Sequence, residues 1–130
     1  MRKIEARIID ALRSQSEFKA GNTEVRDFID AEQPPRIDGK RDLQSKVELH
    51  GNLIAQYNRS LNQLDIRDCG YSTVTTKSRL NALLSEFAPA YRIVQRDWEW
   101  FIDDLSQDTE TLIPWTGAAT FRAGTLIDRW

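Results

Sequence analysis

The sequence predicts an α+β fold, and three observations lead to that prediction. Apolar residues recur at three- and four-residue spacings in 3–18 and again in 75–87, which is the period of an amphipathic helix. Apolar and polar residues alternate around turn residues between 45 and 67, as in an antiparallel sheet. A second alternating segment, rich in aromatic residues, spans 91–102. We therefore expect an N-terminal helix, an antiparallel sheet made of a three-stranded meander plus an aromatic hairpin, and a second helix packed on that sheet.

The length and composition indicate one domain. The chain has 130 residues, of which 40% are hydrophobic and 29% are charged, and both values are ordinary for a globular protein. No apolar stretch approaches the roughly 20 residues that a membrane-spanning helix needs, and the first residues alternate in charge instead of forming an apolar signal region. We expect a single domain over 1–130, without a membrane segment, in the cytoplasm.

The N-terminal part is predicted to contain a helix, an extended segment and a loop. The apolar residues of the helix recur on one side, at Ile4, Ile8, Ile9 and Leu12. Gly21-Asn22 is expected to end this helix, and 23–29 is expected to be extended. Two prolines, a glycine and several charges then predict a surface loop over 31–42.

The meander begins with a hairpin over 45–57, in which Gly51-Asn52 is expected to form a two-residue turn. Such a turn would pair Leu49 with Ile54, Val47 with Gln56 and Glu48 with Ala55. Residues 64–67 alternate again and predict the third strand after a short turn.

The second helix is predicted over 75–87, where Pro89 stops it. Its apolar residues form one stripe: Leu80, Leu83, Leu84 and Phe87. A stripe about 100° wide suits packing across the meander.

The aromatic hairpin is expected to pair 91–95 with 98–102 around Arg96-Asp97. This pairing would place on one face Tyr91, Ile93, Trp98, Trp100 and Ile102. Because that face is the more apolar one, we expect both of its tryptophans to be buried. A short strand is expected over 111–115.

The inventory of catalytic residue types is small. Cys69 is the only cysteine and His50 is the only histidine of the sequence. No disulfide can therefore form within the chain, and a zinc site would lack a second Cys ligand. We interpret Cys69 as a small apolar filler and His50 as a turn residue that makes a backbone hydrogen bond. A thiol hydrolase, or a metal site built from Asp97, Asp103 and Asp108, stays open by counting alone. We expect no enzymatic activity, metal or cofactor, because no set of groups converges.

The start of the second helix is unusual because its first turn is cationic. Thr75 or Thr76 could cap the helix, but Lys77 and Arg79 stand where the helix dipole favours negative charge. In a structural interpretation the threonines cap the helix and the cations face solvent or an acidic neighbour. In a functional interpretation the N–H groups, hydroxyls and cations bind phosphate, together with Arg67 from the preceding strand. The candidate nucleic-acid site is therefore Arg67, Thr75, Thr76, Lys77 and Arg79.

The segment 97–110 carries only acidic charges, in a chain whose net charge is −2. Its aromatic residues could stack on unpaired bases, but the acidic charges would repel phosphates. Acidic residues with aromatic anchors instead favour a protein interface. The candidate protein-binding residues are Asp97, Glu99, Phe101, Asp103, Asp104 and Trp115.

Three strings carry a family resemblance: VELHGNLIA at 47–55, CGYSTVTTKSRLNALL at 69–84 and YRIVQRDWEWFI at 91–102. With them the chain resembles a small family of uncharacterised proteins of tailed phages and prophages that share LHGNxIA and TTKSRLNALL motifs. The resemblance covers about the central half of the chain. It implies a phage context inside a bacterial host and brings no activity.

These observations together predict a non-enzymatic accessory phage protein in the host cytoplasm. Its expected role is to bind a host or phage protein through the acidic, aromatic C-terminal portion. The alternative is binding of the nucleic-acid phosphate backbone through the cationic helix start. Exposed edge strands would also allow a homo-oligomer.

Overall fold

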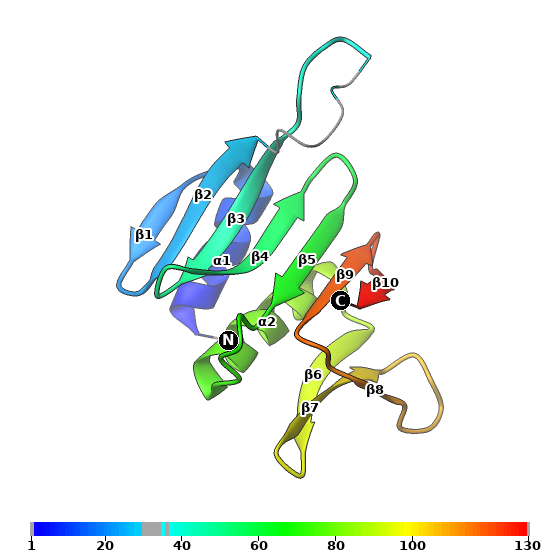
Figure 1. Cartoon of the computed structure of the whole chain (residues 1–130). Helices are drawn as coiled ribbons and strands as arrows, with labels where there is room; N and C mark the ends of the chain where they lie inside the picture. The colour runs from blue at the N-terminus through cyan, green and yellow to red at the C-terminus, as the bar shows by residue number, and fades with distance from the viewer. Residues whose placement is uncertain (1, 30–34, 36, 130) are drawn as a thin grey trace.

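The computed structural model describes residues 2–29, 35 and 37–129, and it confirms the α+β class (Figure 1). The elements in chain order are α1 (Lys3–Ser14), β1 (Phe18–Ala20), β2 (Thr23–Ile29), β3 (Leu43–Leu49), β4 (Asn52–Asn58), β5 (Gln63–Arg67), α2 (Val74–Phe87), β6 (Tyr91–Arg96), β7 (Glu99–Asp104), β8 (Leu112–Pro114), β9 (Ala118–Arg122) and β10 (Thr125–Arg129). Within the described residues, neither helix has the length and apolarity that crossing a bilayer requires.

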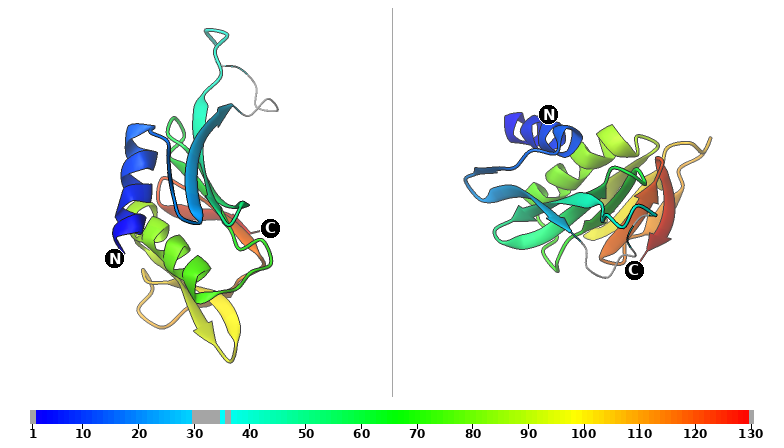
Figure 2. Two further views of the ribbon diagram at one scale, coloured as in Figure 1. Left: turned by 90° about the vertical axis from the view of Figure 1, so that its left-hand side faces the viewer. Right: turned by 90° about the horizontal axis from the view of Figure 1, so that it is seen from above.

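The strands form two antiparallel sheets. The larger one has seven strands in the order β1-β2-β3-β4-β5-β9-β10, and the predicted meander is its central β3-β4-β5 part. The predicted aromatic hairpin, β6 and β7, joins β8 in a separate three-stranded sheet. Figure 2 shows α1 and α2 side by side on one face of the larger sheet, and the small sheet contacts α2 through β6.

The core lies between the two helices and the larger sheet. Its fully buried side chains include Ile8, Leu12, Val25, Val47, Ile54, Leu64, Ile66, Leu80, Leu83, Leu84 and Phe121. The predicted stripe of α2 is buried along its whole length. Its last member, Phe87, packs against Tyr57 with the ring centroids 4.5 Å apart. The burial of this stripe fixes which side of α2 is left for polar contacts.

The first helix is shorter than predicted. It ends at Ser14 because Gln15 adopts a left-handed conformation (φ 58°), and its N–H donates to the Ala11 carbonyl. The predicted helical residues 18–20 form β1, and Gly21-Asn22 is the turn between β1 and β2 instead of the helix end. The predicted extended segment 23–29 is confirmed as β2.

The β3–β4 hairpin has a different register from the predicted one. Its turn is His50-Gly51, with φ values of 52° and 78°, instead of Gly51-Asn52. The observed pairs are Leu49 with Asn52, Glu48 with Leu53 and Val47 with Ala55, so the three predicted pairs are wrong. The earlier turn explains the shift, and a bulge that leaves Ile54 as an extra residue on β4 then changes the register again beyond Leu53.

The β6–β7 hairpin, in contrast, turns one residue later than predicted. Asp97 and Trp98 form its turn, and Arg96 pairs with Glu99. The predicted burial of Trp100 is confirmed, but that of Trp98 is wrong, because Trp98 is 92% exposed. The short strand expected over 111–115 is confirmed as β8.

Of the predicted surface loop, residues 31–34 and 36 lie outside the described residues. Residues 37–41 are exposed, and 37–42 contain neither helix nor strand.

Candidate functional site

Helix α2 is capped two or three residues earlier than the sequence predicts. Thr73 is the N-cap, and its Oγ1 accepts from the Thr76 backbone N–H at 3.1 Å. The hydroxyl of Thr76 lies 3.0 Å from the same Oγ1, and Thr76 is buried. The threonine hydroxyls at this helix start therefore satisfy one another and the backbone.

Arg79 is part of a buried ion pair between the two helices. Its Nη1 lies 2.8 Å from Glu5 Oε2, and the two side chains are only 6% and 3% exposed. Ser78 Oγ donates to the same oxygen at 2.6 Å. Burial alone would raise the pKa of Glu5, but hydrogen bonds from Ser78, Arg79 and the Arg2 backbone outweigh it and lower the pKa below 4.5. Arg79 thus ties α2 to α1 and does not face solvent.

Asn81 completes the edge of β6. Its Nδ2 donates to the Ile93 carbonyl at 2.9 Å, and its Oδ1 accepts from the Ile93 N–H at 2.7 Å. The side chain therefore takes the place that a neighbouring strand would occupy. Together with the cap, the ion pair and the buried leucines, this contact gives most of the TTKSRLNALL string a role in folding.

The other residues of the predicted nucleic-acid site are not gathered in one place. Arg67 ends β5 opposite Ala118, and its Nε is buried without a hydrogen-bond partner among the described residues. Lys77 is half-buried on α2. Thr75 lines a pocket that neither Arg67 nor Lys77 lines.

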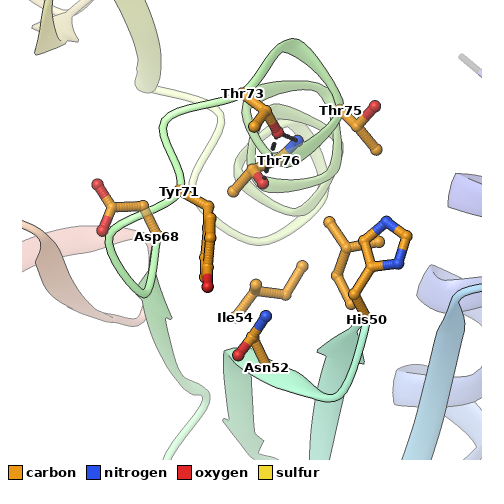
Figure 3. Close-up of a pocket in the computed structure, with 9 residues that line it drawn as sticks. His50, Asn52, Ile54, Asp68, Tyr71, Thr73, Thr75 and Thr76 are labelled. Atoms are coloured by element: carbon orange, nitrogen blue, oxygen red, sulfur yellow. Dashed lines mark hydrogen bonds between the residues drawn. The ribbon is translucent and has the colours of Figure 1, made fainter.

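This pocket of about 470 Å³ lies between the start of α2 and the β3–β4 turn (Figure 3). Its lining consists of Leu49, His50, Asn52, Ile54, Asp68, Tyr71, Thr73, Thr75 and Thr76. The Tyr71 ring stands between Asp68 and Ile54 (Figure 3). No Lys or Arg occurs among these described lining residues, and Asp68 would repel an anion. The charges of the pocket therefore do not favour phosphate.

His50 lines this pocket and Cys69 follows Asp68 in the chain, and in the described residues their side chains bond to Asn22 and Leu53, not to each other. His50 is a turn residue as predicted, and its backbone N–H donates to the Asn22 carbonyl at 2.7 Å. Cys69 is exposed, so its interpretation as an apolar filler is wrong; its thiol donates to the Leu53 carbonyl at 2.7 Å. Desolvation raises the pKa of the thiol, which disfavours the reactive thiolate. No cluster of three or more metal-ligating side chains is found in the described part of the chain.

The tip of the β6–β7 hairpin presents the most exposed tryptophan of the described residues. Both turn residues have positive φ, 52° at Asp97 and 69° at Trp98. The β3–β4 turn has the same geometry but places Gly51 at its second position. A bulky side chain is disfavoured there, because its Cβ approaches the following carbonyl. Trp98 also joins none of the ring or cation–π contacts among the described residues.

Beside Trp98 lies an open groove of about 410 Å³, which we name the hairpin-tip groove. Its lining consists of Asp68, Ser72, Trp98, Glu99, Trp100, Phe101, Pro114, Trp115, Thr116 and Gly117. Trp115 is held in place because its Nε1–H donates to Asp68 Oδ2 at 2.8 Å and its ring lies 6.1 Å from that of Trp100. The residues that line the groove therefore include four aromatic residues and two acidic residues, Asp68 and Glu99.

The acidic members of the predicted protein-binding set divide into two groups. Asp97 and Glu99 are exposed and have no ion-pair partner among the described residues. Asp103 is instead buried and accepts from Arg92 at 3.2 Å. Asp104 accepts from Ser106 and Gln107, and these hydrogen bonds lower its pKa.

Phe101 and Trp115, the aromatic members of the predicted set, are half-buried and line the hairpin-tip groove. The sequence prediction missed the exposure of Trp98. The sequence signal for this exposure was that Asp97-Trp98 could form the hairpin turn as well as Arg96-Asp97, and the former places Trp98 at the tip.

A family model described as Kyanoviridae Gp96 protein matches residues 1–125. The match extends well beyond the central strings that carry the resemblance and confirms its phage context. No curated protein matches the chain, and no solved structure matches it.

Proposed function

Because the chain belongs to the Kyanoviridae Gp96 protein family, a phage protein family, we propose that it is a non-enzymatic accessory protein that binds another protein through its hairpin tip. The partner is a host or phage protein met in the host cytoplasm. The contact surface consists of Asp97, Trp98, Glu99 and the hairpin-tip groove.

The exposure of Trp98 is the observation that carries this proposal. A side chain that is 92% exposed adds little to the core, yet it occupies a turn position that favours glycine. Backbone outliers of this kind concentrate at functional sites. Tryptophan is also enriched among the residues that dominate binding energy in protein interfaces. The two-residue turn fixes the backbone that carries the ring, which reduces the backbone entropy lost on association.

The acidic residues around the tip support a protein partner. Asp97 and Glu99 flank Trp98, and no Lys or Arg occurs among the described residues that line the groove. Such a surface repels phosphates and attracts a basic partner surface.

The alternative, nucleic-acid binding at the start of α2, has less support. Arg79 is paired with Glu5, and Thr76 is buried against Thr73. Of the proposed residues, Arg67, Thr75 and Lys77 remain available for a phosphate. They provide two cations without a common pocket.

A site-specific photo-crosslinker tests the protein-binding proposal. Benzoylphenylalanine replaces Trp98 in one variant and Leu61 in another, and each variant is produced in host cells during infection. Leu61 is a matched control, because it is a 42% exposed apolar residue near the β4–β5 turn. We expect a discrete protein adduct after irradiation of the Trp98 variant alone. Absence of an adduct at position 98, or equal adducts at both positions, would show that the tip is not the docking surface.

A further inference from the structure

We propose that the hairpin-tip groove binds an arginine side chain from a basic segment of the partner protein. This inference rests on the proposed function, since it specifies what the same surface recognises. It follows from the walls of the groove, from its charge and from a matching arrangement elsewhere in the chain.

The walls of the groove suit a flat cation. The residues that line the groove include the aromatic Trp98, Trp100 and Trp115, and the rings of Trp100 and Trp115 lie 6.1 Å apart on one face of the small sheet. A guanidinium group is planar and weakly hydrated, so it stacks on such rings more readily than an ammonium group does. The volume of about 410 Å³ lies in the lower part of the range of ligand pockets, roughly 300–1,000 Å³. It is suited to one or two side chains.

The charge of the groove is unbalanced. Asp68 already accepts from Gly70, Ser72 and Trp115, so its carboxylate is satisfied within the fold. Glu99 has no such partner among the described residues and lies exposed on the same groove. A cation in the groove would therefore meet one free carboxylate and the field of a second.

Elsewhere in the chain, an arginine is held by an aromatic ring and a carboxylate. The Arg13 guanidinium carbon lies 4.7 Å from the Phe87 ring centroid, while its Nη2 pairs with Glu86 Oε1 at 2.8 Å. One ring and one carboxylate thus hold an arginine on the surface of this fold. The hairpin-tip groove offers rings and a carboxylate without the arginine, which the partner would supply.

A peptide titration tests this inference. The probe is a fluorescein-labelled peptide in which arginine alternates with glycine, and its control replaces each arginine with citrulline, a neutral isostere. Fluorescence anisotropy is measured at low and moderate salt, and the indole N–H signals are followed by NMR. We expect the arginine peptide to bind at least about tenfold more tightly than the citrulline peptide and to shift the Trp98 and Trp115 signals.

Three variants define the contact. Glu99→Gln and Trp98→Ala should each weaken binding of the arginine peptide by about three- to tenfold. Asp10→Asn, an exposed acidic position on α1, should leave it unchanged. Thermal unfolding of each variant checks that the fold is retained.

The outcomes separate this inference from the proposed function. Equal binding of the two peptides, no binding of either, or equal weakening by Glu99→Gln and Asp10→Asn would overturn the arginine site. A crosslinked adduct at position 98 would still support protein binding in each of these cases. Loss of that adduct would remove the proposed function itself.

Discussion

Near the start of α2 the unusual cation Arg79 has a partner within the chain, whereas at the tip of the β6–β7 hairpin the unusual side chain Trp98 has no ring or cation–π partner among the described residues. Arg79 is a cation near a helix N-terminus, and it is buried against Glu5. Trp98 is a bulky residue at a position that favours glycine, and it is 92% exposed. An unfavourable residue such as Arg79, whose side chain stabilises the fold, requires no ligand to explain it. An unfavourable residue such as Trp98, whose side chain adds little to the fold, indicates a binding partner.

The same difference separates two of the three strings that carry the sequence resemblance. The TTKSRLNALL string joins α1, α2 and β6 through the Glu5–Arg79 pair and the Asn81–Ile93 contact. The hairpin string instead builds a small sheet whose tip extends from the body of the molecule (Figure 1). Substitutions in the first string should therefore change stability, and those at the tip should change binding.

The largest effect is expected from Arg79→Met. This substitution leaves the Glu5 carboxylate buried without its cation, so the free energy of unfolding should fall by about 3–5 kcal/mol. Urea unfolding followed by tryptophan fluorescence measures the change. The double variant Glu5→Leu/Arg79→Met removes both charges and should lose much less than the sum of the two single variants. Additive losses would show that the pair is not coupled.

The next largest effect is expected from Asn81→Ala. It removes the side chain that bonds to both the N–H and the carbonyl of Ile93, so the free energy of unfolding should fall by about 2–3 kcal/mol. Hydrogen exchange of the Ile93 amide should accelerate more than that of amides in β4. Asn81→Asp keeps the acceptor and loses the donor, and its loss of stability should differ from that of alanine. If the Ile93 amide stays protected in Asn81→Ala, another group covers this edge.

The fold class was predictable because periodicity reports burial, as the α2 stripe from Leu80 to Phe87 shows. The hairpin turns were not, since His50-Gly51 and Gly51-Asn52 both contain a residue that tolerates positive φ and differ by one step of register. The same ambiguity between Arg96-Asp97 and Asp97-Trp98 hid the exposure of Trp98. The partners of Arg79 and Asn81 lie on α1 and β6, and long-range pairing of this kind leaves no local pattern.

The Glu5–Arg79 pair should also make stability depend on pH. The folded protein lowers the pKa of Glu5 below its ordinary value of 4.5, so the folded state binds this proton less readily than the unfolded state does. The stabilisation is therefore complete above that value and is lost as the pH falls through the folded pKa. In Glu5→Gln the fall of unfolding free energy below about pH 4.5 should be shallower than in the unmodified chain. Parallel curves for the two proteins would exclude Glu5 as a contributor.

A smaller effect of opposite sign is expected at the hairpin tip. Trp98→Gly relieves a left-handed residue that contributes little burial, so the free energy of unfolding should rise by about 0.5–1 kcal/mol. Gly51→Ala, at the equivalent position of the β3–β4 turn, should lower it by about 1 kcal/mol. Although it is more stable, the Trp98→Gly variant should bind the arginine peptide more weakly than the unmodified chain does. A loss of stability in Trp98→Gly would mean that the ring supports the fold.

The smallest effect is expected from Lys77→Ala, which tests whether the start of α2 is reserved for the fold. Removing a partly exposed cation from this end of the helix should change the free energy of unfolding by less than about 0.5 kcal/mol, in the stabilising direction. Binding of a labelled single-stranded oligonucleotide, measured by anisotropy at low and moderate salt, should be the same with and without Lys77. Arg67→Ala serves as the second cation of the same hypothesis. If the oligonucleotide bound in a salt-sensitive way and either substitution reduced that binding, the start of α2 would also bind a partner. The proposed difference between the start of α2 and the hairpin tip would then be wrong.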